Sequence, residues 1–190
     1  LARPTLEWTV SDWALLSMGA VVVPVYPTSS TDDVRHILAH SAAKAIVCEQ
    51  RADLERVEAL RADLPALEQA VLVEGGSSVA GDALSFEALL DSGRQGAALS
   101  AEPNPGDTAS IVYTSGTTGV PKGCVITHGN VAAAVRMILD VPDLLREGEV
   151  ALMFLPLAHV YGRIVQWMGA GAGLTLAFCP DVARVAHAAA

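Results

Sequence analysis

Hydrophobic residues recur along this chain with two alternating periods, one typical of helices and one typical of strands. Helical spacing of apolar residues predicts helices at 9–20, around 34–38, around 54–64, at 85–91, around 131–139 and at 158–169. Short β-branched or apolar runs predict strands at 21–26, 44–49, 70–74, 109–114, 124–128, 150–157 and 174–178. Hydroxyl residues at 28–31, followed by Asp32 and Asp33, mark the start of the second helix, because these side chains favour a helix N-terminus.

The order of these elements indicates the fold class. Strands that alternate with helices are typical of parallel strands joined by crossovers, so we expect an α/β fold with mostly parallel sheets flanked by helices. Pro24 predicts that strand 21–26 lies at an edge or carries a bulge, because proline has no N–H to donate. Residues 75–107 are rich in Gly, Ser, Ala and Pro, and we interpret them as a surface connection.

Composition narrows the class of protein. The 190 residues are 52% hydrophobic, 5% aromatic and 17% charged, which predicts a globular protein with a core of Ala, Val and Leu. The net charge of −9 and the absence of a basic stripe in the sequence argue against nucleic acid as a partner. A small anionic ligand stays compatible with this charge, because one lysine, backbone N–H groups and a cation can act together locally.

The cysteines and the hydropathy of the chain bear on where in the cell the protein resides. Cys48, Cys124 and Cys179 are odd in number and far apart in the sequence, with no C-x-x-C motif, and we expect a reduced, cytoplasmic setting. The longest run without charges, 164–180, contains a glutamine and three glycines, whereas a membrane-spanning helix needs about 20 mostly apolar residues. We therefore expect a buried helix, a turn and a strand there. Peripheral contact with a membrane stays open.

One stretch carries most of the chemistry: "IVYTSGTTGVPKG", residues 111–123. Its glycines let the main chain approach a ligand, and its short hydroxyl side chains and one lysine add donors and a positive charge. The residues concerned are Thr114, Ser115, Gly116, Thr117, Thr118, Gly119 and Lys122. Backbone N–H groups, hydroxyls and an ammonium group together suit a phosphate, so we interpret the stretch as a phosphate-binding loop.

Three other interpretations compete for this loop. A polar turn between two strands accounts for the Ser, Thr and Gly content alone. A Walker A loop needs G-x-x-x-x-G-K-[ST], but Pro121 precedes Lys122 here and Gly123 follows it. A nucleophile elbow needs G-x-S-x-G, and Tyr113 stands where the first glycine would be. The sequence therefore disfavours a P-loop NTPase and a serine hydrolase.

The loop also resembles that of a known family. "YTSGTTGVPKG" resembles the signature loop of the adenylate-forming (AMP-binding) superfamily, and "FLPLAHVYGR", residues 154–163, resembles the family's next motif as found in long-chain fatty acyl-CoA synthetases. "GAVVVPVYPTSS" extends the resemblance toward the start of the chain. The resemblance implies that residues 1–190 form part of the N-terminal AMP-binding domain, with the phosphate loop at 113–123 and no C-terminal domain. No Y-G-x-T-E motif follows, so we expect an internal piece that is inactive alone.

The resemblance further implies a reaction. A fatty acid attacks ATP to form an acyl adenylate, and coenzyme A then takes the acyl group, with Mg²⁺ as the metal. Residues 114–122 would hold the β- and γ-phosphates, Thr114 would contact the metal, and Lys122 and His159 would be the catalytic residues. A peptide-synthetase adenylation domain, an aryl-CoA ligase and a non-catalytic nucleotide-binding module stay open as alternatives.

The five histidines differ in what the sequence says of them. His159 is either a positioning residue beside the adenylate, as the resemblance implies, or a helix cap. Thr127 and Asn130 compete as caps of the helix after "ITHGN", and we interpret His128 as structural. His36, His40 and His187 carry no signal in the sequence.

Overall fold

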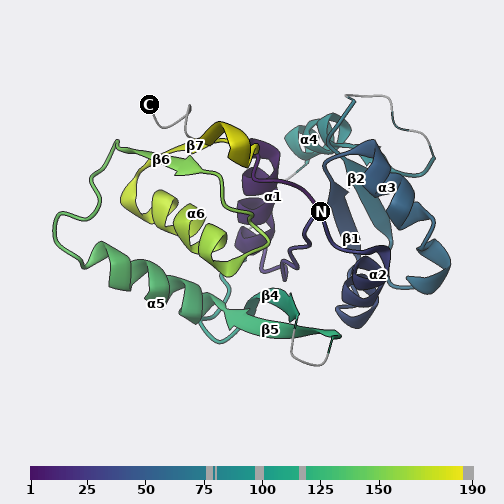
Figure 1. The fold of residues 1–190 in the computed structure, drawn as a ribbon, viewed down its shortest axis with the longest axis horizontal. Helices are drawn as coiled ribbons and strands as arrows, with labels where there is room; N and C mark the ends of the chain where they lie inside the picture. Colours follow the sequence, from purple (N-terminus) through teal and green to yellow (C-terminus); the bar gives the residue numbers. More distant parts are fainter. Residues whose placement is uncertain (76–78, 80, 97–100, 116–118, 186–190) are drawn as a thin grey trace. The chain divides into compact units, whose positions relative to one another are not determined.

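A computed structural model describes residues 1–75, 79, 81–96, 101–115 and 119–185. The chain is an α/β protein that divides into two compact units, and each is described by itself. Unit 1 comprises Leu1–Ala2, Val25–Ser100 and Tyr113–Gly123. Unit 2 comprises Arg3–Pro24, Ala101–Val112 and Cys124–Ala190. Figure 1 shows the elements of both units along the chain.

Unit 1 contains a three-stranded parallel sheet. Its strands follow the order β1 (Ala45–Cys48), β2 (Gln69–Leu72), β3 (Leu84–Ser85). Helix α3 (Arg51–Glu58) packs against β1 and β2, and α4 (Phe86–Gln95) packs against β2 and β3. A short 3₁₀ helix, η1 (Arg61–Asp63), follows α3. The alternation of helix and parallel strand confirms the predicted fold class in this unit.

Helix α2 (Thr31–His40) also belongs to unit 1 and begins where the hydroxyl pattern predicted. The Ser30 hydroxyl accepts a hydrogen bond from the Asp33 N–H at 3.1 Å, which satisfies one of the free donors at the helix start. Val34, Ile37 and Leu38 form its buried stripe, as predicted from their spacing. These three side chains fix α2 in unit 1 and decide which of its faces points away from the core.

Unit 2 is built from three helices and a parallel pair of strands. Its helices are α1 (Leu6–Ser17), α5 (His128–Leu139) and α6 (Val160–Ala172), and a 3₁₀ helix, η2 (Val182–Arg184), follows the strands. β6 (Val150–Met153) pairs with β7 (Thr175–Phe178), and α6 packs on both strands and on α5. A methyl group added at Gly169 would lie 2.5 Å from Leu176 Cδ2, so glycine permits the close approach of α6 to β7.

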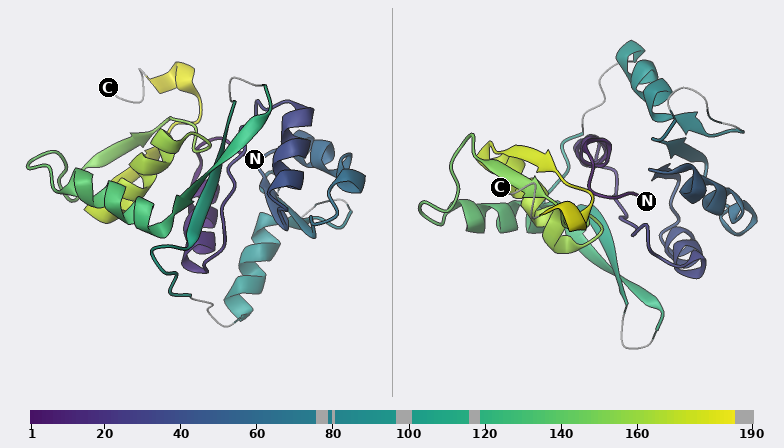
Figure 2. Two further views of the ribbon diagram at one scale, coloured as in Figure 1. Left: turned by 90° about the horizontal axis from the view of Figure 1, so that it is seen from below. Right: turned by 45° about the horizontal axis from the view of Figure 1, so that its top comes forward.

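The strands β4 (Thr108–Ser115) and β5 (Pro121–Thr127) pair with each other and form a sheet of two strands. Only residues 116–120 lie between them, and a parallel pair would need a crossover of about a dozen residues or more, so the pair is an antiparallel hairpin. Figure 2 shows its two long strands side by side.

Several of the predicted boundaries were wrong. The predicted strand 21–26 is a single parallel bridge between Val22 and Ser110, because Pro24 has no N–H to continue a ladder. The predicted strand 150–157 ends at Met153, and Pro156 lies in the turn that leads to α6. The helix predicted at 9–20 covers Leu6–Ser17 because Thr5 caps it, and the pattern at 54–64 is split between α3 and η1.

Candidate functional site

The predicted phosphate loop occupies the tip of the β4–β5 hairpin. Thr114 lies near the end of β4 and Lys122 near the start of β5, and both side chains are exposed. Gly119 has φ +84°, a conformation that favours glycine. Gly116, Thr117 and Thr118 lie outside the described residues, and Ser115 is described only as the last residue of β4.

The Lys122 side chain makes no polar contact with the described residues. Within the described part of the chain, its ammonium group has no ion pair and no hydrogen bond, whereas the exposed Lys44 of the same unit pairs with Glu68 at 3.2 Å. An exposed, unpaired ammonium group can bind an anionic ligand without first breaking an internal pair. The hairpin tip therefore presents one exposed hydroxyl, of Thr114, and one exposed positive charge, of Lys122.

His159 lies in unit 2, at the junction between β6 and α6. It is the N-cap of α6, and its Nδ1 accepts a hydrogen bond from the Tyr161 N–H at 3.1 Å. The ring is exposed and, because Nδ1 accepts, its proton lies on Nε2. Both predicted roles are compatible with this geometry, since the capping bond occupies one ring nitrogen and leaves the other available.

The chain turns tightly just before α6. A methyl group added at Gly162 would lie 2.6 Å from the carbonyl oxygen of Pro156 and 3.1 Å from that of Leu155. These distances are well below ordinary contact, and the atoms concerned are backbone atoms that cannot rotate away. Glycine at 162 therefore allows the first turn of α6 to fold over residues 155–156 and sets the position of His159.

A buried polar network behind this turn was not predicted from the sequence. Arg163 Nη2 donates to Asp12 Oδ1 at 2.8 Å, and Gln166 Nε2 donates to Asp12 Oδ2 at 2.7 Å. The Thr9 hydroxyl donates to Gln166 Oε1 at 3.0 Å. All four side chains are buried, and they connect α1 to the first two turns of α6. The available signal was an aspartate in the middle of α1 and the one charged residue of α6.

Two tryptophans enclose the Arg163 guanidinium. Its central carbon lies 5.3 Å from the ring centroid of Trp8 and 4.8 Å from that of Trp167, both within cation–π range. Arg163 Nε and Nη1 have no hydrogen-bond partner among the described residues, so the two rings offset part of the cost of removing this charge from water. Burial raises the pKa of Asp12, against the opposing effect of Arg163, and burial also lowers the pKa of Arg163, against that of Asp12.

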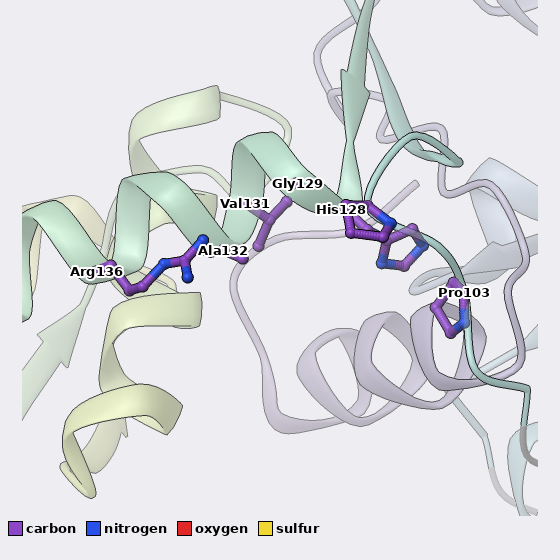
Figure 3. A pocket seen from close by; sticks show the side chains of 7 residues that line it. Pro103, His128, Gly129, Val131, Ala132 and Arg136 are labelled. Atoms are coloured by element: carbon purple, nitrogen blue, oxygen red, sulfur yellow. The ribbon is translucent and has the colours of Figure 1, made fainter.

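A shallow pocket of about 370 Å³ lies on unit 2, at the start of α5. It is lined by Pro103, Pro105, His128, Gly129, Val131, Ala132 and Arg136, and Figure 3 shows Arg136 and Pro103 at opposite ends with His128 between them. Thr127 caps α5 and forms a capping box with Asn130, so the two candidate caps act together. The backbone N–H of His128 donates to Asp107 O at 3.0 Å.

Metal-binding and membrane-spanning features are absent from the described residues. No group of three or more His, Cys, Asp or Glu side chains there is arranged to hold a metal ion. None of the helices described has the length and hydrophobicity needed to cross a membrane. Cys48, Cys124 and Cys179 are all free thiols, and only Cys124 is exposed.

Comparison with known proteins gives a family and a set of relatives. A family model described as "AMP-binding enzyme" matches residues 1–190. The long-chain-fatty-acid–CoA ligase FadD15 of Mycobacterium bovis is 38% identical over 178 residues, which are 93% of this chain and 30% of that protein. Long chain acyl-CoA synthetase 7, peroxisomal, of Arabidopsis thaliana is 36% identical, over 90% of this chain and 25% of its own.

A solved structure gives the same fold. The N-terminal domain of FACL13 from Mycobacterium tuberculosis, in an inhibitor-bound crystal structure, superposes with a TM-score of 0.77 and 26% identity. The match covers 96% of this chain and 44% of that one. The chain thus spans between a quarter and a third of the length of the two ligases above.

Proposed function

The chain belongs to the AMP-binding enzyme family, and from this we propose that it is part of the N-terminal domain of an ATP-dependent long-chain fatty acid:CoA ligase. Two relatives support the choice of substrate, because proteins that are 38% and 36% identical over nine-tenths of the chain are described as a long-chain-fatty-acid–CoA ligase and a long chain acyl-CoA synthetase. In this proposal residues 113–123 are the phosphate loop, and His159 is a second part of the active site.

The proposed reaction has two steps. In the first, a carboxylate oxygen of the fatty acid attacks the α-phosphorus of ATP, the bond to the bridging oxygen breaks, and pyrophosphate leaves. In the second, the thiol of coenzyme A loses its proton and attacks the acyl carbon, and AMP leaves. A carboxylate is a poor acceptor of nucleophiles until one oxygen becomes part of a good leaving group, and the adenylate supplies that group.

The observation that carries the proposal is the exposed ammonium group of Lys122 at the hairpin tip, which has no partner among the described residues. Negative charge moves onto the pyrophosphate during the first step, so a positive charge there stabilises the transition state more than the ground state. The proposed role of Thr114 is to donate its exposed hydroxyl to the same polyphosphate or to bind Mg²⁺ through its oxygen, the ligand atom that this ion prefers. Magnesium would neutralise further phosphate charge.

His159 has a proposed positioning role. The Tyr161 N–H holds Nδ1 and thereby fixes the ring plane, which leaves the Nε2 proton as a donor. A donor of this kind can orient a carboxylate or an acyl phosphate oxygen without acting as a base. The buried network of Asp12, Arg163 and Gln166 supports the turn that carries His159.

Exchange of labelled pyrophosphate into ATP by the full-length protein tests the proposal. We expect exchange that depends on palmitate, and we expect Lys122→Ala to lower its rate without a comparable change in fatty-acid affinity. Lys44→Ala, which removes an exposed lysine of the same unit, is the matched control and should behave like wild type. Exchange with an amino acid or with benzoate but not with palmitate would assign the protein to a different branch of adenylate-forming enzymes.

A further inference from the structure

Two histidines of α2 contact the two strands of the hairpin near its tip. His36 and His40 are four residues apart, so they share one face of the helix, and their rings stack with centroids 5.4 Å apart. The Tyr113 ring meets both edge-on, at 6.2 Å from His36 and 5.8 Å from His40. The three rings form one cluster, which we call the histidine clamp.

The clamp makes a hydrogen bond to each strand of the hairpin. His36 Nε2 lies 2.9 Å from the carbonyl oxygen of Pro121, and because a carbonyl only accepts, the histidine is the donor. His40 Nδ1 lies 2.7 Å from the Tyr113 hydroxyl. The Tyr113 side chain is buried, and burial raises the pKa of its phenol, so the hydroxyl keeps its proton.

The positions of these contacts in the chain give them their significance. Tyr113 directly precedes Thr114, and Pro121 directly precedes Lys122. One helix therefore holds the Tyr113 side chain just before Thr114 and the main-chain carbonyl of Pro121 just before Lys122. Since α2 is itself fixed by its buried stripe of three apolar side chains, the clamp connects the hairpin tip to the core of unit 1.

We propose that His36 and His40 are positioning residues that hold Thr114 and Lys122 in place for binding a polyphosphate. The inference rests on the proposed function for the identity of the ligand. A hairpin of two strands is marginally stable without further support, so its tip needs an external anchor to keep a fixed geometry. A bond to the Pro121 carbonyl fixes the path of the main chain, which apolar packing alone would not do. Misplacement of a catalytic group by about 1 Å can cost about 100-fold in rate.

Matched substitutions in the full-length protein separate positioning from packing. His36→Leu replaces the imidazole with an apolar side chain and so removes the hydrogen-bond donor. His36→Gln instead supplies a donor near the place of Nε2. We expect His36→Leu to lower kcat for pyrophosphate exchange by about 10- to 100-fold, with the KM for fatty acid unchanged, and His36→Gln to recover most of it. Arg35→Ala is the control on the same helix, because Arg35 pairs with Asp32 and Asp63 and not with the described residues of the hairpin.

Hydrogen exchange in the ligand-free protein gives a readout independent of activity. In His36→Leu and in Tyr113→Phe, we expect the amides of residues 119–127 to exchange at least about tenfold faster, while those of β2 stay unchanged. Unchanged exchange at 119–127 would overturn the clamp whatever the kinetics show. Faster exchange with a normal kcat in an active enzyme would overturn the positioning role. If the wild type catalyses no exchange with any carboxylate, the proposed function fails, and the amide data then decide on the clamp alone.

Discussion

Arg163 of α6 donates to the carboxylate of Asp12 of α1 across 2.8 Å, and neither side chain is accessible to solvent. The residues are 151 positions apart in the sequence, so the pair fixes the start of α6 against an element formed much earlier in the chain. Two tryptophan rings cover the guanidinium, and Gln166 satisfies the second carboxylate oxygen. The pair thus supports the turn that carries His159, and a break in the pair should affect both stability and the motif.

Removal of one partner should cost more than removal of both. Arg163→Met leaves the Asp12 carboxylate buried without its cation, and we expect the free energy of unfolding of the full-length protein to fall by about 3–5 kcal/mol. The double variant Asp12→Leu/Arg163→Met should recover part of this loss, because no unpaired charge remains. Urea denaturation measures both, and Arg94→Ala, which breaks the exposed pair with Asp91, should change stability by less than about 1 kcal/mol. Equal losses in the single and double variants would contradict a charge-based cost.

Two substitutions separate the capping role of His159 from a role of its ring. His159→Ala removes the acceptor of the Tyr161 N–H and should cost about 1 kcal/mol of stability. His159→Asn supplies another good capping side chain and should restore stability, but it has no imidazole. We expect the His159→Asn enzyme to be stable and slow in pyrophosphate exchange. Full activity in that variant would leave His159 with the capping role alone.

The pattern of apolar residues predicted the elements well because burial decides them locally. The stripe Val34, Ile37 and Leu38 and the cap at Ser30 predicted α2, and the short apolar runs predicted the strands β1 and β2. The boundary errors in two strands occurred at Pro24 and Pro156, where a missing N–H or a turn ended a strand that hydrophobicity alone would have continued. Hydrophobicity does not report which N–H groups are available.

Only part of the candidate site could be predicted from the sequence. Lys122 and Thr114 were identified from the loop, because their chemistry is local to that stretch. The clamp and the buried pair were missed, because His36 acts through Pro121, 85 residues away, and Asp12 acts through Arg163. Such partnerships depend on which helix faces which strand, and no spacing along the chain encodes that. The sequence did contain hints: two histidines at i and i+4, and one charged residue, Arg163, in the mostly apolar α6.

The turn before α6 should tolerate no side chain at position 162. Gly162→Ala places a methyl group 2.6 Å from the Pro156 carbonyl oxygen, so the backbone must shift, and we expect a loss of stability of about 1–3 kcal/mol and slower pyrophosphate exchange. Gly93→Ala is the matched control in another helix, because nothing lies within 4 Å of its added methyl group. That control should be neutral or stabilise by up to about 1 kcal/mol, since alanine is the better helix former. Similar outcomes for both glycines would show that the close contact is relieved without cost.

The Cys48 thiol should make stability depend on pH in the alkaline range. Burial raises its pKa from an ordinary value of 9.0 to about 11. Between these values the unfolded chain loses the thiol proton and the folded chain keeps it, so the folded state binds more protons and its stability falls as pH rises. The slope from this one group is at most about 1.4 kcal/mol per pH unit, and its contribution to stability is fully present below pH 9 and lost through pH 11.

Urea denaturation of the full-length protein from pH 8 to 11 should therefore give a shallower decline for Cys48→Ala than for wild type. Cys124→Ala, which removes an exposed thiol, is the control and should follow the wild-type curve. Parallel curves for Cys48→Ala and wild type would mean that the thiol ionises in the folded protein as readily as in the unfolded chain.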